Sequence, residues 1–199
     1  MKKTLVIPIL FIVMFSCVQV NKEHKQLKNK KSEQNFLSFR LVENKFIEFD
    51  IDTLKNFREI TRIIEGIDCK KNYAVFKMET DEKIFKIQPL QFCEDIFDYK
   101  FREIIYINTD SITVNEKLRF SIDSLNMILN YHLNNPKDDK DYPSKDEKRL
   151  ISVNVDSTKN IVETKNLLLN IVSHINELNT KSNFSFIFEN WGLIKVIEE

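Results

Sequence analysis

The sequence is poor in glycine and alanine: 199 residues contain only Gly66 and Gly192, and Ala74 is the single alanine. Backbone loops that cradle phosphate groups need several glycines close together, and the patterns G-x-x-x-x-G-K-[ST] and G-x-G-x-x-G are both missing. The nucleophile elbow G-x-S-x-G is missing as well. These absences count against the nucleotide-binding and hydrolase classes that depend on such loops.

The chain also lacks an excess of charge of either sign, because 30 Lys and Arg residues balance 30 Asp and Glu residues. No global field would attract nucleic acid, so we predict no nucleic-acid partner. A hydrophobic fraction of 42% with 30% charged residues indicates a folded core rather than disorder. The length suits one domain, or two small ones that share a surface.

Residues that usually carry metal or acid–base chemistry are few or scattered. The three histidines, His24, His132 and His174, show no paired spacing such as H-E-x-x-H. We expect His132 near a helix end, where a positive charge suits the dipole, and His174 at the boundary of a helix. We therefore predict no metal site, no cofactor and no catalytic residue, and we expect a protein that is not an enzyme.

Acidic residues gather in three short clusters, which have simpler explanations than a metal site. The first pair can cap a helix, and the last group suits a solvated loop better than a calcium loop, because it has no glycine turn and Tyr142-Pro143 interrupts it. A carboxylate pair assembled in space stays open as a third, hydrolase alternative. The clusters are Asp50/Asp52, Glu94/Asp95/Asp98 and Asp138/Asp139/Asp141.

The N-terminus begins with Lys2 and Lys3 and continues into an apolar run over residues 5–15. That run is too short to span a hydrocarbon core, which takes about 20 helical residues, and it suits the apolar part of a signal peptide. It ends at Met14-Phe15-Ser16-Cys17, which resembles the bacterial lipobox, although Phe15 departs from the usual pattern. An uncleaved anchor helix and an ordinary secretory signal remain open.

The resemblance implies that a diacylglyceryl group is attached to Cys17, that the chain is cut before it, and that its new amine is acylated. Several acyl chains, such as palmitate, make a durable anchor, because each buried CH₂ contributes about 0.8 kcal/mol. Val18 is not the aspartate that retains lipoproteins in the inner membrane, so the resemblance favours the outer membrane. The soluble domain is then expected in the periplasm or at the cell surface.

Residues 18–35 are polar and basic and show no sustained apolar period, so they are predicted to form a flexible tether. Fully extended, they reach on the order of 60 Å. The chain is accordingly divided into four parts: a signal peptide (residues 1–16), the lipidated Cys17 with a basic tether (17–35), an N-terminal α+β subdomain (36–100) and a C-terminal α+β subdomain (101–199).

Residues 36–199 predict an α+β fold, with small mixed sheets and two or three amphipathic helices. In the first subdomain we expect a hairpin of residues 37–41 and 46–49, a helix capped by Asp52 that ends at Gly66, and a second hairpin. Apolar spacing then gives the order β-β-α-β-α-β. The other expected elements are a hairpin of residues 73–78 and 83–87, a short helix at 92–99, strands at 104–107, 112–114, 151–155, 184–188 and 193–197, and helices at 122–133 and 161–178.

Part of this second half resembles the periplasmic domain of the ExbD/TolR family. The resemblance rests on Ile107-Asn108-Thr109-Asp110-Ser111-Ile112-Thr113-Val114-Asn115, on Leu125 and Leu129, and on Ile151-Ser152-Val153-Asn154-Val155-Asp156 before a helix. It covers less than half of the chain. The family's motor function depends on an acidic residue in a transmembrane helix, and residues 5–15 contain none, so the resemblance implies a docking module without proton coupling.

With Cys17 committed to lipid, two cysteines remain in an oxidising compartment. Cys69 and Cys93 bracket the predicted second hairpin, and a disulfide between them would contribute about 3 kcal/mol. Two separate buried thiols are the alternative. Trp191, beside Gly192, is the expected partner contact, against simple packing.

These observations lead to three hypotheses of function. The first is a membrane-anchored envelope lipoprotein that acts as a binding or structural module for an unknown envelope protein or glycan. The second is an ExbD/TolR-like accessory domain of an envelope transport or energy-transduction machine, for which a homodimer through a sheet edge stays open. The third is an envelope hydrolase.

Overall fold

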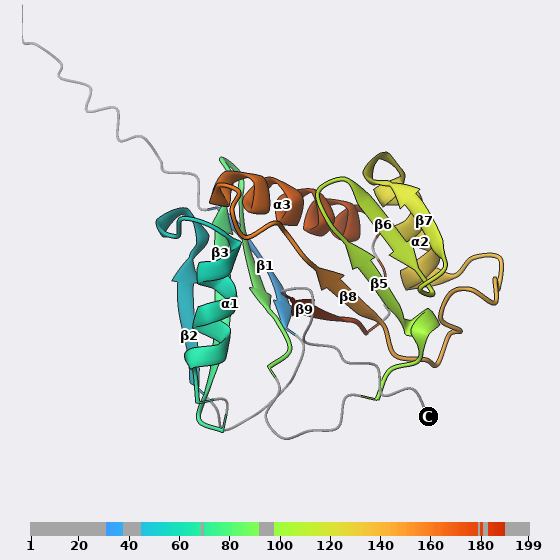
Figure 1. Ribbon diagram of the computed structural model, residues 1–199, viewed down its shortest axis with the longest axis horizontal. Coiled ribbons are helices and arrows are strands. Elements are labelled where there is room, and N and C mark those ends of the chain that lie inside the picture. The colour runs from blue at the N-terminus through green and yellow to red at the C-terminus, as the bar shows by residue number, and fades with distance from the viewer. Residues whose placement is uncertain are drawn as a thin grey trace, which may run out of the picture. The chain divides into compact units, whose positions relative to one another are not determined.

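The computed structural model describes residues 31–37, 45–68, 70–91, 98–178, 180 and 183–189. Two mixed sheets and three α-helices make up this part of the chain (Figure 1). In chain order the elements are β1 (Ser32–Leu37), β2 (Lys45–Asp50), η2 (Ile51–Thr53), α1 (Phe57–Gly66), β3 (Asn72–Glu79), β4 (Lys83–Gln88), η3 (Phe101–Glu103), β5 (Ile104–Ile107), β6 (Ser111–Val114), β7 (Leu118–Ser121), η4 (Ile122–Ser124), α2 (Leu125–Asn134), β8 (Leu150–Val153), α3 (Ile161–Leu178) and β9 (Ser185–Phe188).

The first sheet has the strand order β1-β4-β3-β2. Strands β3 and β4 form an antiparallel hairpin, whereas β1 lies parallel to β4 and β2 lies parallel to β3. Along β3 the side chains of Ala74, Phe76 and Met78 alternate onto one face and are fully buried, as the period of two requires. Helix α1 provides the crossover between the parallel strands β2 and β3.

The second sheet has the order β7-β6-β5-β8-β9. Strands β5, β8 and β9 are parallel neighbours, and β6 and β7 continue the sheet in antiparallel fashion. Ile105, Ile151 and Phe186 lie side by side in register and are buried. Because β5, β8 and β9 run the same way, their N-terminal ends meet at one edge of this sheet.

One hydrophobic core joins the two sheets. Helix α3 turns Leu168, Ile171 and Val172 into this core, and Figure 1 shows it running past both sheets. The ring of Phe188 in β9 lies 5.8 Å from that of Phe76 in β3, measured between centroids. Each such buried side chain stabilises the fold by roughly 1.5–3 kcal/mol, so the sheets depend on each other for stability.

The chain that follows β4 also links the two sheets through the backbone. Pro89 forms an isolated parallel bridge with Phe186, and the amide of Leu90 donates to the carbonyl of Phe186 over 2.7 Å. On the core side, the ring of Phe36 in β1 lies 6.2 Å from Phe184 and 6.3 Å from Phe186. The end of β1 therefore lies next to the beginning of β9.

The predicted α+β class is confirmed, with its mixed sheets and three helices. The predicted hairpin appears as β3 and β4, and the three predicted helices appear as α1, α2 and α3. The C-terminal order β-β-α-β-α-β is found with one strand more, because β7 pairs with β6 before α2 begins. The expected helix at residues 92–99 lies largely outside the described residues, and the strand at 193–197 lies wholly outside them.

The hairpin expected from residues 37–41 and 46–49 cannot be followed, because residues 38–44 lie outside the described residues; its second strand appears as β2, which pairs in parallel with β3. Two other expectations about the N-terminal half were wrong. β1 begins at Ser32, so the last residues assigned to the tether belong to the sheet. The cap of α1 is Asn56, whose side chain accepts from the amide of Glu59 over 3.2 Å, and not Asp52.

One large apolar side chain lies at the surface: Phe46, on the edge strand β2, is 46% exposed. In the part of the chain that the structure describes, no helix is both long and apolar enough to cross a membrane.

Candidate functional site

A polar groove lies at the edge where β8 and β9 begin. It consists of three adjoining hollows of about 910, 480 and 290 Å³, all of which have Asn183 in their walls. We call this feature the Asn183 groove. Its described lining comprises Gln34, Asn35, Phe36, Leu37, Tyr99, Asn134, Asn135, Asp138, Lys145, Asp146, Glu147, Lys148, Arg149, Ile175, Asn176, Thr180, Asn183, Phe184 and Ser185.

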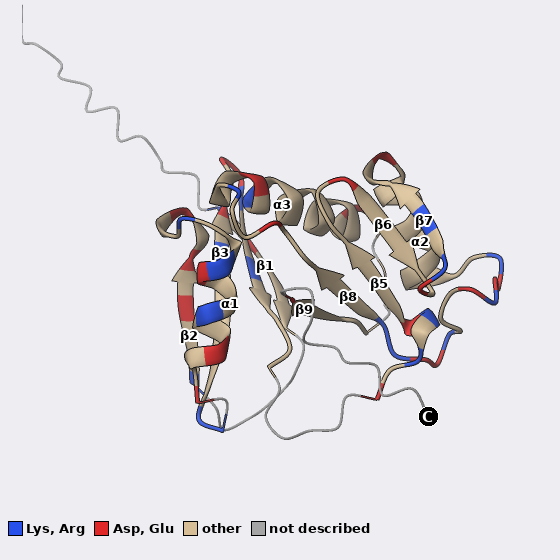
Figure 2. Cartoon of the chain, in the orientation of Figure 1, with Lys and Arg blue, Asp and Glu red and all other residues tan. Residues whose placement is uncertain are grey.

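The loop of residues 135–149, between α2 and β8, forms one wall of the groove, and charges of both signs alternate along it (Figure 2). Asn135 ends α2 in a left-handed conformation with φ 38°. Its side-chain amide donates to the carbonyls of Asp139 and Pro143 over 3.0 and 3.1 Å, and its oxygen accepts from the amide of Asp139 over 2.8 Å. Asn135 therefore shapes the loop and leaves no part of its amide for a ligand.

Glu147 fastens the far end of this loop to the rest of the domain. Its carboxylate accepts from Lys100 over 2.6 Å, from Arg102, and from the amide of Ser144 over 2.9 Å. The Arg102 guanidinium, followed by Lys100 and Ser144, holds the pKa of the Glu147 carboxyl far below its usual range. The negative charge of Glu147 is thus balanced by Lys100 and Arg102, which lie outside the groove. Its low pKa makes this carboxylate a poor general acid or base.

Arg149 occupies the floor of the groove and is only 4% exposed. Its Nε donates to the carbonyl of His132 over 3.1 Å, Nη1 to that of Glu147 over 2.7 Å, and Nη2 to that of Ser144 over 2.9 Å. Burial lowers the pKa of its guanidinium. Main-chain carbonyls satisfy this cation, and no carboxylate among the described residues forms an ion pair with it.

His132 lies behind Arg149 in the core and is fully buried. Burial, followed by the charge of Arg149, lowers the pKa of its imidazole to about 3. The expectation of a positive charge suited to the helix end is therefore wrong, because the ring is neutral at physiological pH. His174 is on the other helix, α3, with Nδ1 3.4 Å from Glu177 Oε2, and it does not meet His132.

Several groups that line the groove are available to a ligand. The side chains of Lys145, Asp146, Asp138 and Asn183 make no hydrogen bond to any other described residue. Lys148 donates to the carbonyl of Asp98 over 2.9 Å, and its Nζ lies 5.4 Å from the centre of the Tyr99 ring. Within the described part of the chain, the groove therefore presents the side chains of Lys145, Asp138 and Asn183 without a hydrogen-bond partner, and Asp146 within the field of Arg149.

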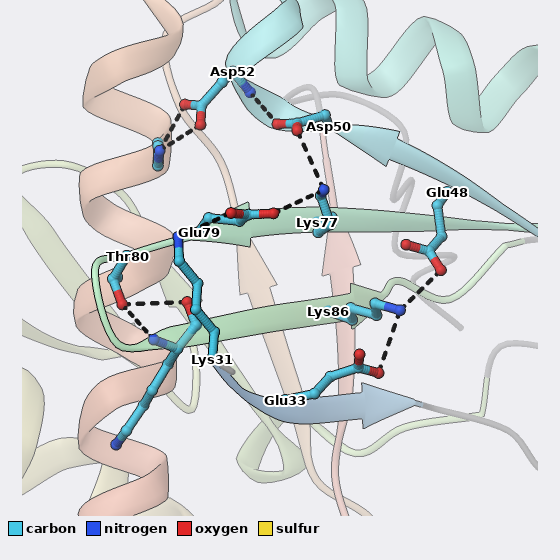
Figure 3. Close-up of polar contacts among 11 residues, drawn as sticks. Lys31, Glu33, Glu48, Asp50, Asp52, Lys77, Glu79, Thr80 and Lys86 are labelled. Carbon is cyan, nitrogen blue, oxygen red and sulfur yellow. Dashed lines mark hydrogen bonds and ion pairs between the residues drawn. The ribbon is translucent and has the colours of Figure 1, made fainter. Parts of the chain in front are cut away.

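The outer face of the first sheet is the other charged surface, and its charges pair with one another (Figure 3). Lys77 lies between Glu79, at 2.9 Å, and Asp50, at 3.5 Å, and Glu79 also meets Lys31 at 3.0 Å. Lys77 and then Lys31 lower the pKa of Glu79 to about 2.

A second chain of pairs crosses the same face. Lys86 lies 2.9 Å from Glu48 and 3.3 Å from Glu33. Since Lys31, Lys77 and Lys86 each have a carboxylate partner, the described part of this face is a weaker candidate for a ligand than the groove.

The acidic clusters of the sequence have structural roles where the structure describes them. Asp50 caps η2, and Asp52 meets Lys165 Nζ at 2.6 Å. Asp139 and Asp141 bond within their own loop or to Asn115. The described residues contain no group of three or more His, Cys, Asp or Glu side chains that could hold a metal ion.

The structure does not describe the residues that the sequence singled out most strongly. Cys17, Cys69, Cys93 and Trp191 lie outside the described residues. The charged loop was visible in the sequence, but Asn183 was missed. Its only signal is the polar run of residues 179–183 between a helix and a strand, which looks like any other connection.

Comparison with known proteins gives no further guidance, since no family model, curated protein or solved structure matches the chain.

Proposed function

We propose that this protein is a lipoprotein of the bacterial cell envelope, anchored to a membrane through Cys17, whose α+β domain is a non-catalytic binding module. The observation that carries the proposal is the Asn183 groove. It has the size of a ligand site, and its free polar groups converge on one hollow of about 910 Å³.

The chemistry of the lining favours binding over catalysis. Nucleophilic catalysis needs a hydroxyl or thiol within reach of a base, and the described lining contains no histidine or cysteine. Glu147 and Arg149, the least exposed charged groups, hold the loop in place. What remains at the surface of the groove are hydrogen-bonding groups suited to recognition.

The anchor is supported by the residues that precede the domain. The apolar run ends at Ser16-Cys17, and the first strand begins at Ser32. Residues 18–31 then separate lipid from domain and reach on the order of 45 Å when extended. That length lets the groove meet a partner beyond the head groups. By the resemblance to the lipobox, the outer membrane is the favoured site.

The anchor is tested by metabolic labelling with an alkyne analogue of palmitate, followed by membrane fractionation. Wild-type protein is expected to carry the label and to sediment with membranes, and Cys17→Ser to lose both properties. Cys93→Ser is the matched control, because it removes a thiol and leaves the lipidation site intact. A labelled, membrane-bound Cys17→Ser variant would refute the anchor.

The binding module is tested by replacing Asn183 with a photo-crosslinking benzophenone amino acid in intact envelopes. An adduct is expected from position 183 and not from position 126, an exposed asparagine of α2 outside the groove. Equal adducts at both positions, or none at 183, would contradict the role of the groove.

A second candidate function is an ExbD/TolR-like accessory domain. The observation in its favour is the order of β5, β6, α2, β8, α3 and β9, which follows the expected β-β-α-β-α-β apart from the inserted β7. Strand β7 is an edge of the second sheet among the described strands, and Leu118 on it is 38% exposed. Light scattering tests this proposal: a dimer that Leu118→Lys converts to a monomer would favour it, and a monomeric wild type would oppose it.

A further inference from the structure

We propose that the ligand of the Asn183 groove is an electrically neutral oligosaccharide of more than one sugar unit. The inference rests on the binding role proposed above and specifies the chemical class of the ligand. It follows from three properties of the groove: its balance of charge, its mixture of donors and acceptors, and its elongated form.

The balance of charge excludes strongly ionic ligands. The hollow of about 910 Å³ is lined by three cations, Lys145, Lys148 and Arg149, and by three carboxylates, Asp138, Asp146 and Glu147. A polyacidic ligand would be repelled by the carboxylates, and a polycation by the cations. A ligand without net charge avoids both penalties.

The mixture of donors and acceptors fits hydroxyl groups. Asp138 and Asp146 can only accept hydrogen bonds, Lys145 can only donate them, and the amide of Asn183 does both. Each hydroxyl of a sugar is donor and acceptor at once, so one ring can satisfy neighbours of opposite kind. In the adjoining hollow of about 480 Å³ the side chains of Leu37 and Phe184 add an apolar surface for the CH face of a sugar.

The form of the groove indicates a chain rather than a single sugar. The hollow that contains Tyr99 shares Lys148, Arg149 and Asn183 with the hollow of about 910 Å³, and Leu37, Asn183 and Phe184 with the hollow of about 290 Å³ beside β1. Gln34, Asn35 and Asn176 line the β1 end with further amides. Because the three hollows together are much larger than one sugar ring, a ligand that fills them has several.

The proposal is tested by isothermal titration calorimetry of the full-length chain in detergent. The probes are two neutral oligosaccharides, chitotetraose and maltotetraose, their monosaccharides, a tetramer of galacturonic acid, and an uncharged extended peptide. We expect at least one neutral tetramer to bind, its monosaccharide to bind more weakly, and the acidic tetramer and the peptide not to bind. Affinity for the neutral tetramer should be unchanged between low and high salt, because no net charge is paired.

Asn183→Ala is expected to weaken this binding about tenfold, the loss of roughly one hydrogen bond. Asn126→Ala, the matched control on the exposed side of α2, should bind as the wild type does. Circular dichroism of both variants shows whether they fold.

The possible failures can be told apart. Binding of the acidic tetramer or of the peptide alone would overturn the neutral-glycan proposal. So would an absence of binding by both neutral tetramers. An adduct at position 183 in envelopes would then show that the groove still binds a partner, of another class. Loss of that adduct as well would overturn the binding role itself.

Discussion

The guanidinium of Arg149 and the imidazole of His132 lie together in the core, where Arg149 Nε donates over 3.1 Å to the main-chain carbonyl of His132. Two basic side chains are thus buried next to each other, and only that of Arg149 is charged. The arginine keeps its proton because carbonyls surround it, and the histidine loses its own because burial and that neighbouring charge oppose it. The two residues join the end of α2 to the start of β8, beneath the groove.

Replacing Arg149 should destabilise the whole domain, because four carbonyls, those of His132, Ser144, Lys145 and Glu147, would lose their donors. For Arg149→Met we expect a loss on the order of 3 kcal/mol in the free energy of unfolding, measured by urea denaturation. Arg62→Met removes an exposed arginine of α1 and should change stability by less than about 0.5 kcal/mol. Equal effects of the two substitutions would show that the carbonyl contacts contribute little.

Acid should weaken the fold through His132 before it protonates ordinary carboxylates. The unfolded chain binds a proton at the usual histidine pKa of 6.5, whereas the folded chain binds it only near pH 3. The contribution of His132 to the free energy of unfolding is therefore fully present above pH 6.5 and is lost as the pH falls toward 3. Between pH 6.5 and 4.5 the expected loss is about 2 kcal/mol.

The measurement compares the slope of unfolding free energy against pH for the wild type and His132→Leu. The wild type must be compared with the variant because Glu189 also contributes to this slope. Burial raises the pKa of Glu189, so above its ordinary pKa its protonation increases the free energy of unfolding as the pH falls, which is opposite to the effect of His132. The slope attributable to His132 should vanish in the variant, and His174→Gln should keep it. If His132→Leu retains the full slope, the buried imidazole is not its source.

The ion pair between Glu147 and Arg102 should hold the loop more than it stabilises the domain. Arg102 is 38% exposed and Glu147 12%, so solvent screens part of their attraction. A double-mutant cycle with Glu147→Gln and Arg102→Met should give a coupling of about 1 kcal/mol. Hydrogen exchange should quicken at residues 144–149 in Glu147→Gln. A coupling near zero, with unchanged exchange, would contradict the role of this pair.

Asn135 should be sensitive to both its conformation and its side chain. Asn135→Ala removes three hydrogen bonds and places alanine at φ 38°, in the left-handed region that asparagine tolerates better, so we expect a loss of about 2 kcal/mol. Asn135→Gly removes the same bonds and relieves the strain, so thermal denaturation should show a smaller loss. A glycine variant as unstable as the alanine variant would mean that the backbone conformation is unimportant.

Local patterns in the sequence predicted the elements whose partners are close along the chain. The hairpin of β3 and β4 followed from two apolar runs around a polar turn, and α3 from apolar residues at helical spacing. The parallel pairs β1–β4 and β2–β3 could not be read in this way, because register between distant strands leaves no turn signal between them. Asp52 and Asn56 are both good caps, and sequence alone did not choose between them.

The site was less predictable than the fold. The charged loop stood out in composition, but the groove also needs β1, Tyr99 and Asn183, which are far apart in the chain. Arg149 gave no signal, since its partners are main-chain carbonyls that any residue type provides. The residues with the clearest motif, around Cys17, lie outside the described residues, and their pattern predicts an anchor and not a ligand site.

The position of β1 has a mechanical consequence. It is the first described strand, it pairs only with β4 among the described strands, and it walls one end of the groove. Lys31, just before it, is held to the sheet by its 3.0 Å contact with Glu79. Because the ring of Phe36 in β1 packs against Phe85 and Phe186 of the core, a displacement of β1 would disturb the wall of the groove and the core together.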